Sequence, residues 1–438
     1  MVLSIYHPRF RQFFKGVKQK RGYSTLVIAL LVFYQGRIFA SIFDLSLELQ
    51  YASVSISFFL IYILYCKDHL KINRYLFLSI ITMLISLLIG FWMGWYPRDI
   101  LADVVRYIAP FLGFTAGLYI FGRLQYERVI YFIFFISTVE LIIYCESVFG
   151  KIYHVIHGSP LIEYAKHGLN VSGFYFFLFI CFLKKRMLNR VGKFLAFCYT
   201  ISFFISPILL MSKARTITML FSTALVCLFV VKRRTGLIIV IAFLVCIFTG
   251  IKYLDTDHVF SRTYAAIELL QSGEYSKDPS TGVRIAEISN ILDQLNKALP
   301  YSILFGMGSG ALHFETAMKV EGGRHAEDVR KNGGVHDIYT IFFGYLFRYG
   351  VIGFGLVLFW TGFVMKKLIK CIKHNKEDPF KYSICLSVIL YILYAFLSDN
   401  FVAVYVYGNF HYGLILAIAF VVAHHKNPVF KARHIKSY

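Results

Sequence analysis

The sequence predicts an all-α polytopic membrane protein with about twelve transmembrane helices and one large extracytoplasmic helical loop. The prediction rests on composition, on the order of the apolar runs and on where the basic residues fall. The 438 residues are 58% hydrophobic and 16% charged, and the mean hydropathy is +0.63. Soluble domains are about 45–50% apolar and about 25% charged, so most of the apolar surface of this chain must face lipid.

The apolar runs predict the membrane helices. A helix needs about 20 mostly apolar residues to cross a bilayer, because the hydrocarbon core holds no water to satisfy an open backbone. The first run lacks a small-residue cleavage site and is expected to be retained as a helix. The runs, in order, are Tyr23–Ala40, Leu49–Tyr65, Tyr75–Trp95, Val104–Gly122, Val129–Phe149, Gly168–Leu183, Phe194–Met211, Ala214–Val231, Gly236–Tyr253, Ile338–Met365, Tyr382–Leu397 and Phe401–Ala423.

The charge distribution predicts the orientation. The formal net charge of +22 would suggest nucleic-acid binding in a soluble protein. Here 29 of the 46 Lys and Arg residues, against four acids, fall in segments at every second connection. These segments are Arg9–Arg21, Lys67–Arg74, Arg123 with Arg128, Lys184–Lys193, Lys232–Arg234, Lys366–Lys381 and Lys426–Lys436. The positive-inside rule places them and both termini in the cytoplasm, which excludes a nucleic-acid partner.

One long hydrophilic connection divides the chain into residues 1–253 with nine predicted spans, an extracytoplasmic loop over 254–337, and residues 338–438 with three spans. Within the loop, Thr281–Leu299 has helical periodicity. Its predicted apolar face consists of Ile285, Ile288, Ile291, Leu292, Leu295 and Leu299. The predicted opposite face consists of Glu287, Asn290, Asp293 and Lys297.

Two features of the loop suggest ligand contacts. Arg284 lies in the first turn near the centre of the apolar stripe, where a cation is unfavourable for the helix dipole unless an anion binds there. An arginine that snorkels over its own stem, or pairs with a nearby acid, is the alternative. The glycine-rich turn Leu304–Gly310, which includes Gly308, predicts a tight bend or a close backbone approach to a ligand, and the bend is favoured.

Two further groups lie near the predicted outer boundary. His336, followed by Tyr339, stands at the mouth of the next membrane helix, where a neutral imidazole could accept a proton, although a lone histidine is more often structural. Lys213 and Arg215 form a turn with no acid nearby in sequence, which suggests an anionic ligand.

Arg106 and Arg348 are further cations in or near the spans. Asp103 and Asp99 precede Arg106 by one and two helical turns, which favours a structural ion pair, while the partner of Arg348 cannot be assigned. His154 and His157 lack a clear third ligand and are not expected to bind a metal.

Together these motifs resemble the O-antigen polymerase and ligase superfamily of bacterial inner-membrane glycosyltransferases. The matching elements are the long loop before the third-last span, the turn Ser212–Arg215, Arg284 at the start of the loop helix, the glycine turn, and His336 followed by Gly350–Gly353. Asp337 replaces the usual Asn. The interval from His336 to Gly350 is about one helical turn longer than the ligase pattern, which favours the polymerase.

The resemblance implies a periplasmic reaction on glycans linked to undecaprenyl pyrophosphate, both as donor and as acceptor. It implies that Arg215 and Arg284 hold the donor and stabilise the departing lipid pyrophosphate. It also implies that His336 either accepts the proton of the acceptor hydroxyl or orients that hydroxyl as it attacks the anomeric carbon. Lys213, Arg106, Arg348, Gly308 and Tyr339 are the expected substrate-binding residues. No metal or cofactor is expected, and a chain-length regulator and a flippase are expected partners.

Other functions remain open at the level of sequence. The ligase, which transfers the glycan to lipid A-core, shares the donor and the motifs. A flippase or secondary transporter also has about twelve helices, but its charges would follow the transport path rather than gather on one face. A scaffold subunit would tolerate mutation of Arg284 and His336.

Overall fold

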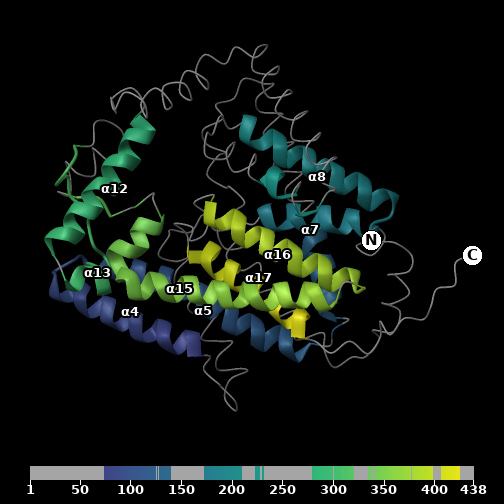
Figure 1. The fold of residues 1–438 in the computed structure, drawn as a ribbon, viewed down its shortest axis with the longest axis horizontal. Helices are drawn as coiled ribbons and strands as arrows, with labels where there is room; N and C mark the ends of the chain where they lie inside the picture. The colour runs from purple at the N-terminus through teal and green to yellow at the C-terminus, as the bar shows by residue number, and fades with distance from the viewer. Residues whose placement is uncertain are drawn as a thin grey trace, which may run out of the picture.

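The computed structural model describes much of the chain and is mostly helical in its described parts, which contain no strand. Figure 1 shows the arrangement. The described residues are 74–124, 126, 128–139, 172–209, 222–226, 229–230, 279–298, 300–319, 334–336, 338, 341–375, 377–397 and 406–424.

Three described helices are long and apolar enough to cross a membrane. They are α4 (Arg74–Trp92), α5 (Pro97–Arg123) and α15 (Ile341–His374). The predicted all-helical class and the presence of helices able to span a bilayer are therefore confirmed, while the number of spans stays a prediction. The predicted runs Tyr23–Ala40, Leu49–Tyr65 and Gly236–Tyr253 lie outside the described residues.

The other long helices coincide with predicted runs. These are α7 (Ser172–Lys184), α8 (Arg190–Leu209), α16 (Pro379–Leu397) and α17 (Val406–His424). Helix α5 packs along α4 and α17, and α15 packs against α4, α16 and α17. Gly413 of α17 lies against the backbone of Pro110 in α5 so closely that a Cβ would overlap it. Small residues at such crossings let apolar helices approach, as in other membrane bundles.

An aromatic core joins the bundle. Trp360 of α15 is fully buried, and its ring centroid lies 4.7 Å from that of Phe111 and 5.5 Å from that of Phe114, both on α5. Tyr412 of α17 meets the same indole edge-on at 6.2 Å. Tilted and edge-on ring pairs are the favoured arrangements of aromatic side chains. The packing fixes α5, α15 and α17 relative to one another, and two of these helices carry the site.

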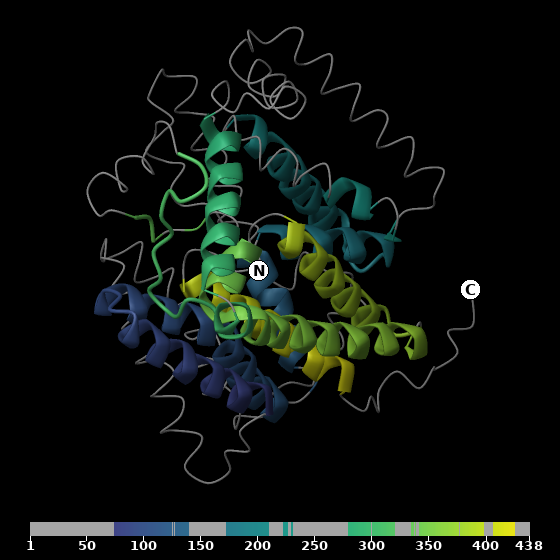
Figure 2. The same ribbon diagram turned by 60° about the vertical axis from the view of Figure 1, so that its left-hand side comes forward.

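The loop helix α12 (Pro279–Lys297) and the short helix α13 (Tyr301–Phe305) lie at one end of the bundle. Figure 2 shows α12 with one end beside the first turns of α15. A small apolar cluster connects the two: Ile291 and Leu295 of α12 with Met307, Ile338 and Phe347. The predicted amphipathic helix over 281–299 is confirmed.

The predicted faces of this helix were partly wrong. Glu287 and Asn290, expected to face water, are fully buried, whereas Leu292 is 47% exposed. At Asn290 the cause is the strap, residues 311–319, whose backbone contacts this side chain. Its backbone groups need polar partners once buried, and polar side chains of α12 supply them. Periodicity alone could not show a covering segment.

Asn290 is the main tie between α12 and the strap. Its Oδ1 accepts hydrogen bonds from the amides of Ala317 and Met318, both at 2.8 Å, and its Nδ2 donates to the Met318 carbonyl at 2.9 Å. The strap in turn exchanges two 3.0 Å backbone hydrogen bonds between His313 and Val335. Val335 directly precedes His336, so α12 holds the strap that positions this histidine.

Replacing Asn290 by alanine should lower the free energy of unfolding by about 1–3 kcal/mol, because buried backbone groups of the strap lose their partners. Thermal unfolding of the purified full chain and limited proteolysis of the strap measure the effect. Asn296→Ala is the matched control, since Asn296 is exposed on the same helix. Equal unfolding temperatures for the two variants would contradict the assignment.

Candidate functional site

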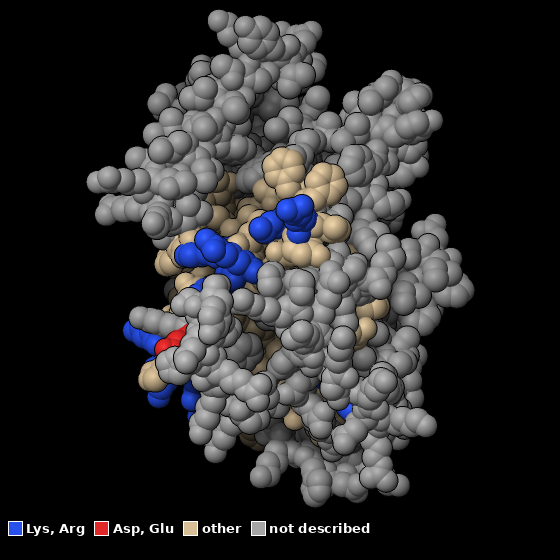
Figure 3. Space-filling model, turned by 90° about the vertical axis from the view of Figure 1, so that its right-hand side faces the viewer, with Lys and Arg blue, Asp and Glu red and all other residues tan. Residues whose placement is uncertain are grey.

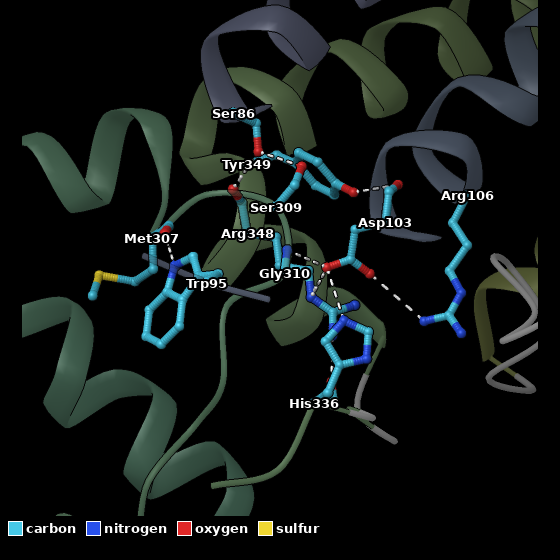
Figure 4. Close-up of polar contacts among 10 residues, drawn as sticks. All are labelled: Ser86, Trp95, Asp103, Arg106, Met307, Ser309, Gly310, His336, Arg348 and Tyr349. Atoms are coloured by element: carbon cyan, nitrogen blue, oxygen red, sulfur yellow. Dashed lines mark hydrogen bonds and ion pairs between the residues drawn. The ribbon is translucent and has the colours of Figure 1, made fainter. Parts of the chain in front are cut away.

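A buried carboxylate on α5 organises the site. Asp103 has no exposed surface. Burying a charge without partners is costly, so its surroundings must supply opposite charges and hydrogen-bond donors. Four groups do so, as Figure 4 shows: Arg106, His336, Arg348 and the amide of Gly310. We call Asp103 and these four groups the Asp103 cluster.

Two arginines flank the carboxylate. Arg348 Nε lies 2.8 Å from Asp103 Oδ2, and Arg106 Nη1 lies 3.6 Å from Oδ1. The Arg106 pair has the i, i+3 spacing on one helix. When the imidazole of His336 is neutral, the charges of Asp103, Arg106 and Arg348 sum to +1. A cationic centre of this kind, at the end of apolar helices, favours an anionic ligand.

His336 joins the same oxygen. Its Nε2 lies 3.2 Å from Asp103 Oδ2, and its carbonyl accepts a hydrogen bond from Arg348 Nη2. Because an ionised carboxylate only accepts hydrogen bonds, this contact places the proton on Nε2. Nδ1 then carries the lone pair of the neutral imidazole. The side chain of His336 is 15% exposed, so the ring is held at the surface of the cluster and not sealed within it.

The glycine turn after α13 brings backbone donors to the cluster. Gly306, Gly308 and Gly310 have φ of 79°, 89° and 81°, a region that L side chains rarely adopt. The Gly310 amide donates to Asp103 Oδ2 at 2.8 Å. Gly308 packs on the backbone of Gly90 in α4, where an added Cβ would lie 2.5 Å from the Gly90 nitrogen. The glycines thus form the predicted tight bend, and the close approach seen here is to the backbone of another helix.

Hydrogen bonds fix this turn between α4 and α15. Ser86 of α4 meets Ser309 Oγ at 2.9 Å and donates to the Arg348 carbonyl at 3.1 Å. Trp95 Nε1 donates to the Met307 carbonyl at 2.9 Å. Figure 4 shows these contacts on the side of the cluster away from Arg106. The turn is consequently part of the helix packing, which holds the Gly310 amide in place.

Helix α15 is interrupted at Gly350, with φ 64° and ψ −170°. The break lets Gly350 lie against the backbone of Leu304 and Phe305 in α13. It also orients the turn before it: Tyr349 Oη donates to the Asp103 carbonyl at 2.7 Å, and Arg348 reaches the carboxylate of the same residue. A continuous helix would carry these two side chains in other directions.

The structure brings together three of the residues singled out in the sequence: His336, Arg106 and Arg348. The Arg106–Asp103 pair has the geometry that the spacing predicted. Arg284 lies in the first half of α12, half-buried, and is not among the described groups that contact Asp103. Arg215, Lys213 and Tyr339 lie outside the described residues.

Sequence reasoning missed the central role of Asp103, which it treated only as a partner for Arg106. Asp103 directly precedes the predicted run Val104–Gly122 and lies within the candidate span α5, where an acid is rare and usually functional. Its other partners could not be found by spacing, since His336 is 233 residues and Gly310 is 207 residues away. Only the packing of α5 against α15 and the turn brings them to one oxygen.

The comparisons with known proteins add no family: no family model matches this chain, and a search of curated proteins finds no match. The class that fold and site define is therefore a helical protein with helices able to span a membrane and a buried Asp–His–Arg cluster at one end of them.

Proposed function

We propose that this chain is an inner-membrane glycosyltransferase that joins undecaprenyl-pyrophosphate-linked repeat units into O-antigen or a related surface polysaccharide on the periplasmic side. The observation that carries the proposal is the convergence of His336, two arginines and a backbone amide on Asp103. A base beside fixed cations is what transfer from a pyrophosphate donor requires. The motifs that carry the family resemblance supply His336 and, from the glycine turn, the backbone amide of Gly310.

In the proposed reaction His336, the arginines and Asp103 each have one role. The hydroxyl oxygen of the acceptor sugar attacks the anomeric carbon of the donor, and its proton passes to Nδ1 of His336. The bond from the anomeric carbon to the pyrophosphate oxygen breaks, and the lipid pyrophosphate leaves with the electron pair. Arg348 and Arg106, with Arg284 and Arg215, stabilise its negative charge. Asp103 is a positioning residue, because it holds the imidazole with the proton on Nε2.

The distribution of basic residues supports a periplasmic site. The last turns of α7 and α15 carry Lys184 and Lys373, and Arg74 begins α4. Figure 3 shows Lys and Arg side chains on the face of the molecule where α15 ends and α16 begins. Arg348 of the Asp103 cluster lies in the first turns of α15, at the opposite end of that helix, which Figure 1 shows beside α12 and α13. By the positive-inside rule the basic end is cytoplasmic, so the cluster faces the periplasm.

The gathering of charges at one end also favours an enzyme over a transporter, whose charged residues follow a path across the bilayer. The polymerase and the ligase differ in the acceptor to which the glycan is transferred. Loss of a polymerase should leave lipid A-core with a single repeat, whereas loss of a ligase should leave bare lipid A-core and stranded lipid-linked polymer. A knockout of the gene in its host therefore distinguishes the two activities.

The direct test is reconstitution of the purified full chain in liposomes with one purified lipid-linked repeat unit, followed by analysis of the lipid-linked products. Wild-type protein should form ladders of two or more repeats without any lipid A-core. Arg215→Ala and Arg284→Ala should each abolish ladder formation while the protein still inserts and accumulates, because each removes a charge from the leaving pyrophosphate. Wild-type ladders from both variants would refute the site assignment, and no ladder from wild-type protein would refute the polymerase.

A further inference from the structure

An aromatic floor lies at the end of the bundle opposite to the Asp103 cluster. Tyr75 of α4 and Phe420 of α17 both pack on Phe363 of α15, with centroid distances of 5.4 Å between Tyr75 and Phe363 and 6.1 Å between Phe363 and Phe420. Three helices therefore contribute one ring each to this cluster, which we call the aromatic floor. None of these rings takes part in the proposed transfer reaction.

Two cations converge on this floor. Arg74 Cζ lies 4.9 Å from the Tyr75 centroid and 5.5 Å from the Phe363 centroid, and Arg74 Nη2 donates to Tyr75 Oη at 3.2 Å. Lys367 Nζ lies 5.6 Å from the same Phe363 ring. Cation–π contacts orient both side chains. They do not neutralise the two positive charges, which repel each other.

No carboxylate in the described part of the chain lies within ion-pair distance of Arg74 or Lys367. Lys366, Lys370 and Lys373 lie on the same part of α15 and add to the positive charge. Two like charges held beside one ring by two different helices are stabilised when an anion binds between them. The arrangement therefore favours a ligand that brings negative charge.

The surface beside these cations is apolar. Leu78, one turn after Arg74 on α4, is 45% exposed, and Phe359, one turn before Phe363 on α15, is 78% exposed. Residues four apart share one face of a helix, so each cation stands at the end of an exposed apolar strip. A ligand that fits both parts has a phosphate at one end and hydrocarbon chains at the other.

We propose that Arg74 and Lys367 bind the phosphate of an anionic phospholipid, whose acyl chains lie along the exposed strips of α4 and α15. Basic sites between membrane helices recognise anionic lipid headgroups in this way. A zwitterionic lipid carries its own cationic group, which competes with Arg74 and Lys367 for the phosphate. Such a lipid should therefore bind more weakly than an anionic one. This binding site is independent of the glycosyltransferase activity proposed above.

Native mass spectrometry of the detergent-purified full chain tests the proposal, with phosphatidylglycerol and phosphatidylcholine as the added lipids. Wild-type protein should retain phosphatidylglycerol about 10-fold more strongly than phosphatidylcholine. Arg74→Gln with Lys367→Gln should abolish this preference. Lys370→Gln with Lys373→Gln removes the same charge from the same end of the molecule, away from the ring, and should keep it.

Three results would overturn the proposal. Equal retention of the two lipids by wild-type protein would show that the headgroup charge is not recognised. An equal loss in both double variants would show that net charge, and not the aromatic site, attracts the lipid. Displacement of the lipid by inorganic phosphate at matched concentration would show a site for a free anion rather than for a phospholipid.

Discussion

Replacing Asp103 by asparagine should lower the rate of glycan transfer by about 10²- to 10⁴-fold. The amide of asparagine can donate to Nε2 of His336, which moves the imidazole proton to Nδ1 and removes the proposed base. The initial rate of ladder formation in proteoliposomes, per amount of folded protein, measures the effect. We expect the loss mainly in kcat, because the cations that hold the donor remain.

The same substitution also affects stability, and the two effects need separate readouts. Arg348 loses its buried carboxylate partner, and breaking a buried ion pair costs about 3–5 kcal/mol. Thermal unfolding therefore accompanies the rate measurement. Asp99→Asn is the control, since Asp99 is one turn away on α5, carries the same charge and makes no contact with the cluster. Wild-type rates from folded Asp103→Asn protein would show that Asp103 is structural only.

Replacing His336 by glutamine should lower the transfer rate by a similar factor, about 10²- to 10⁴-fold, because the amide can keep the hydrogen bond to Asp103 but cannot accept the acceptor's proton. Stability should change little, since the carboxylate keeps both arginines and the Gly310 amide. The measurement is the dependence of the initial rate on donor concentration.

His374→Gln serves as the control for His336→Gln. His374 is exposed at the far end of α15, and its Nδ1 donates to the Lys370 carbonyl at 2.8 Å. This variant should retain the wild-type kcat and KM. A His336→Gln protein that changes only KM for the donor would indicate that His336 binds substrate and transfers no proton.

The helical class followed from the sequence because apolar runs of this length have few other structures open to them. The predicted runs match helices α4, α5, α15 and α16, and most of their first and last residues differ by only a few positions. The loop helix was also predictable, because its 3.6-residue period is local. Its orientation was not, since Asn290 and Glu287 are buried, and the segment that covers Asn290 is a strap from later in the chain.

The site shows the same division between local and long-range information. Arg106 and Asp103 lie one turn apart, so their pairing could be read from spacing. His336 and Arg348 were noticed singly, as a histidine at a helix mouth and a cation near the boundary. Their common partner could not be identified, because α5 reaches them only through its packing on α4, α15 and the glycine turn.

The local ion pair also bears on the synthesis of the protein. Asp103 leaves the ribosome 233 residues before His336, which at about 5–20 residues per second is an interval of roughly 10 to 50 seconds. During that time α5 must enter the bilayer with its carboxylate still lacking the later partners. Arg106, three residues on, emerges with Asp103 and can accompany it from the start. Besides any part in binding substrate, Arg106 thus lets a buried acid be inserted long before the rest of its site exists.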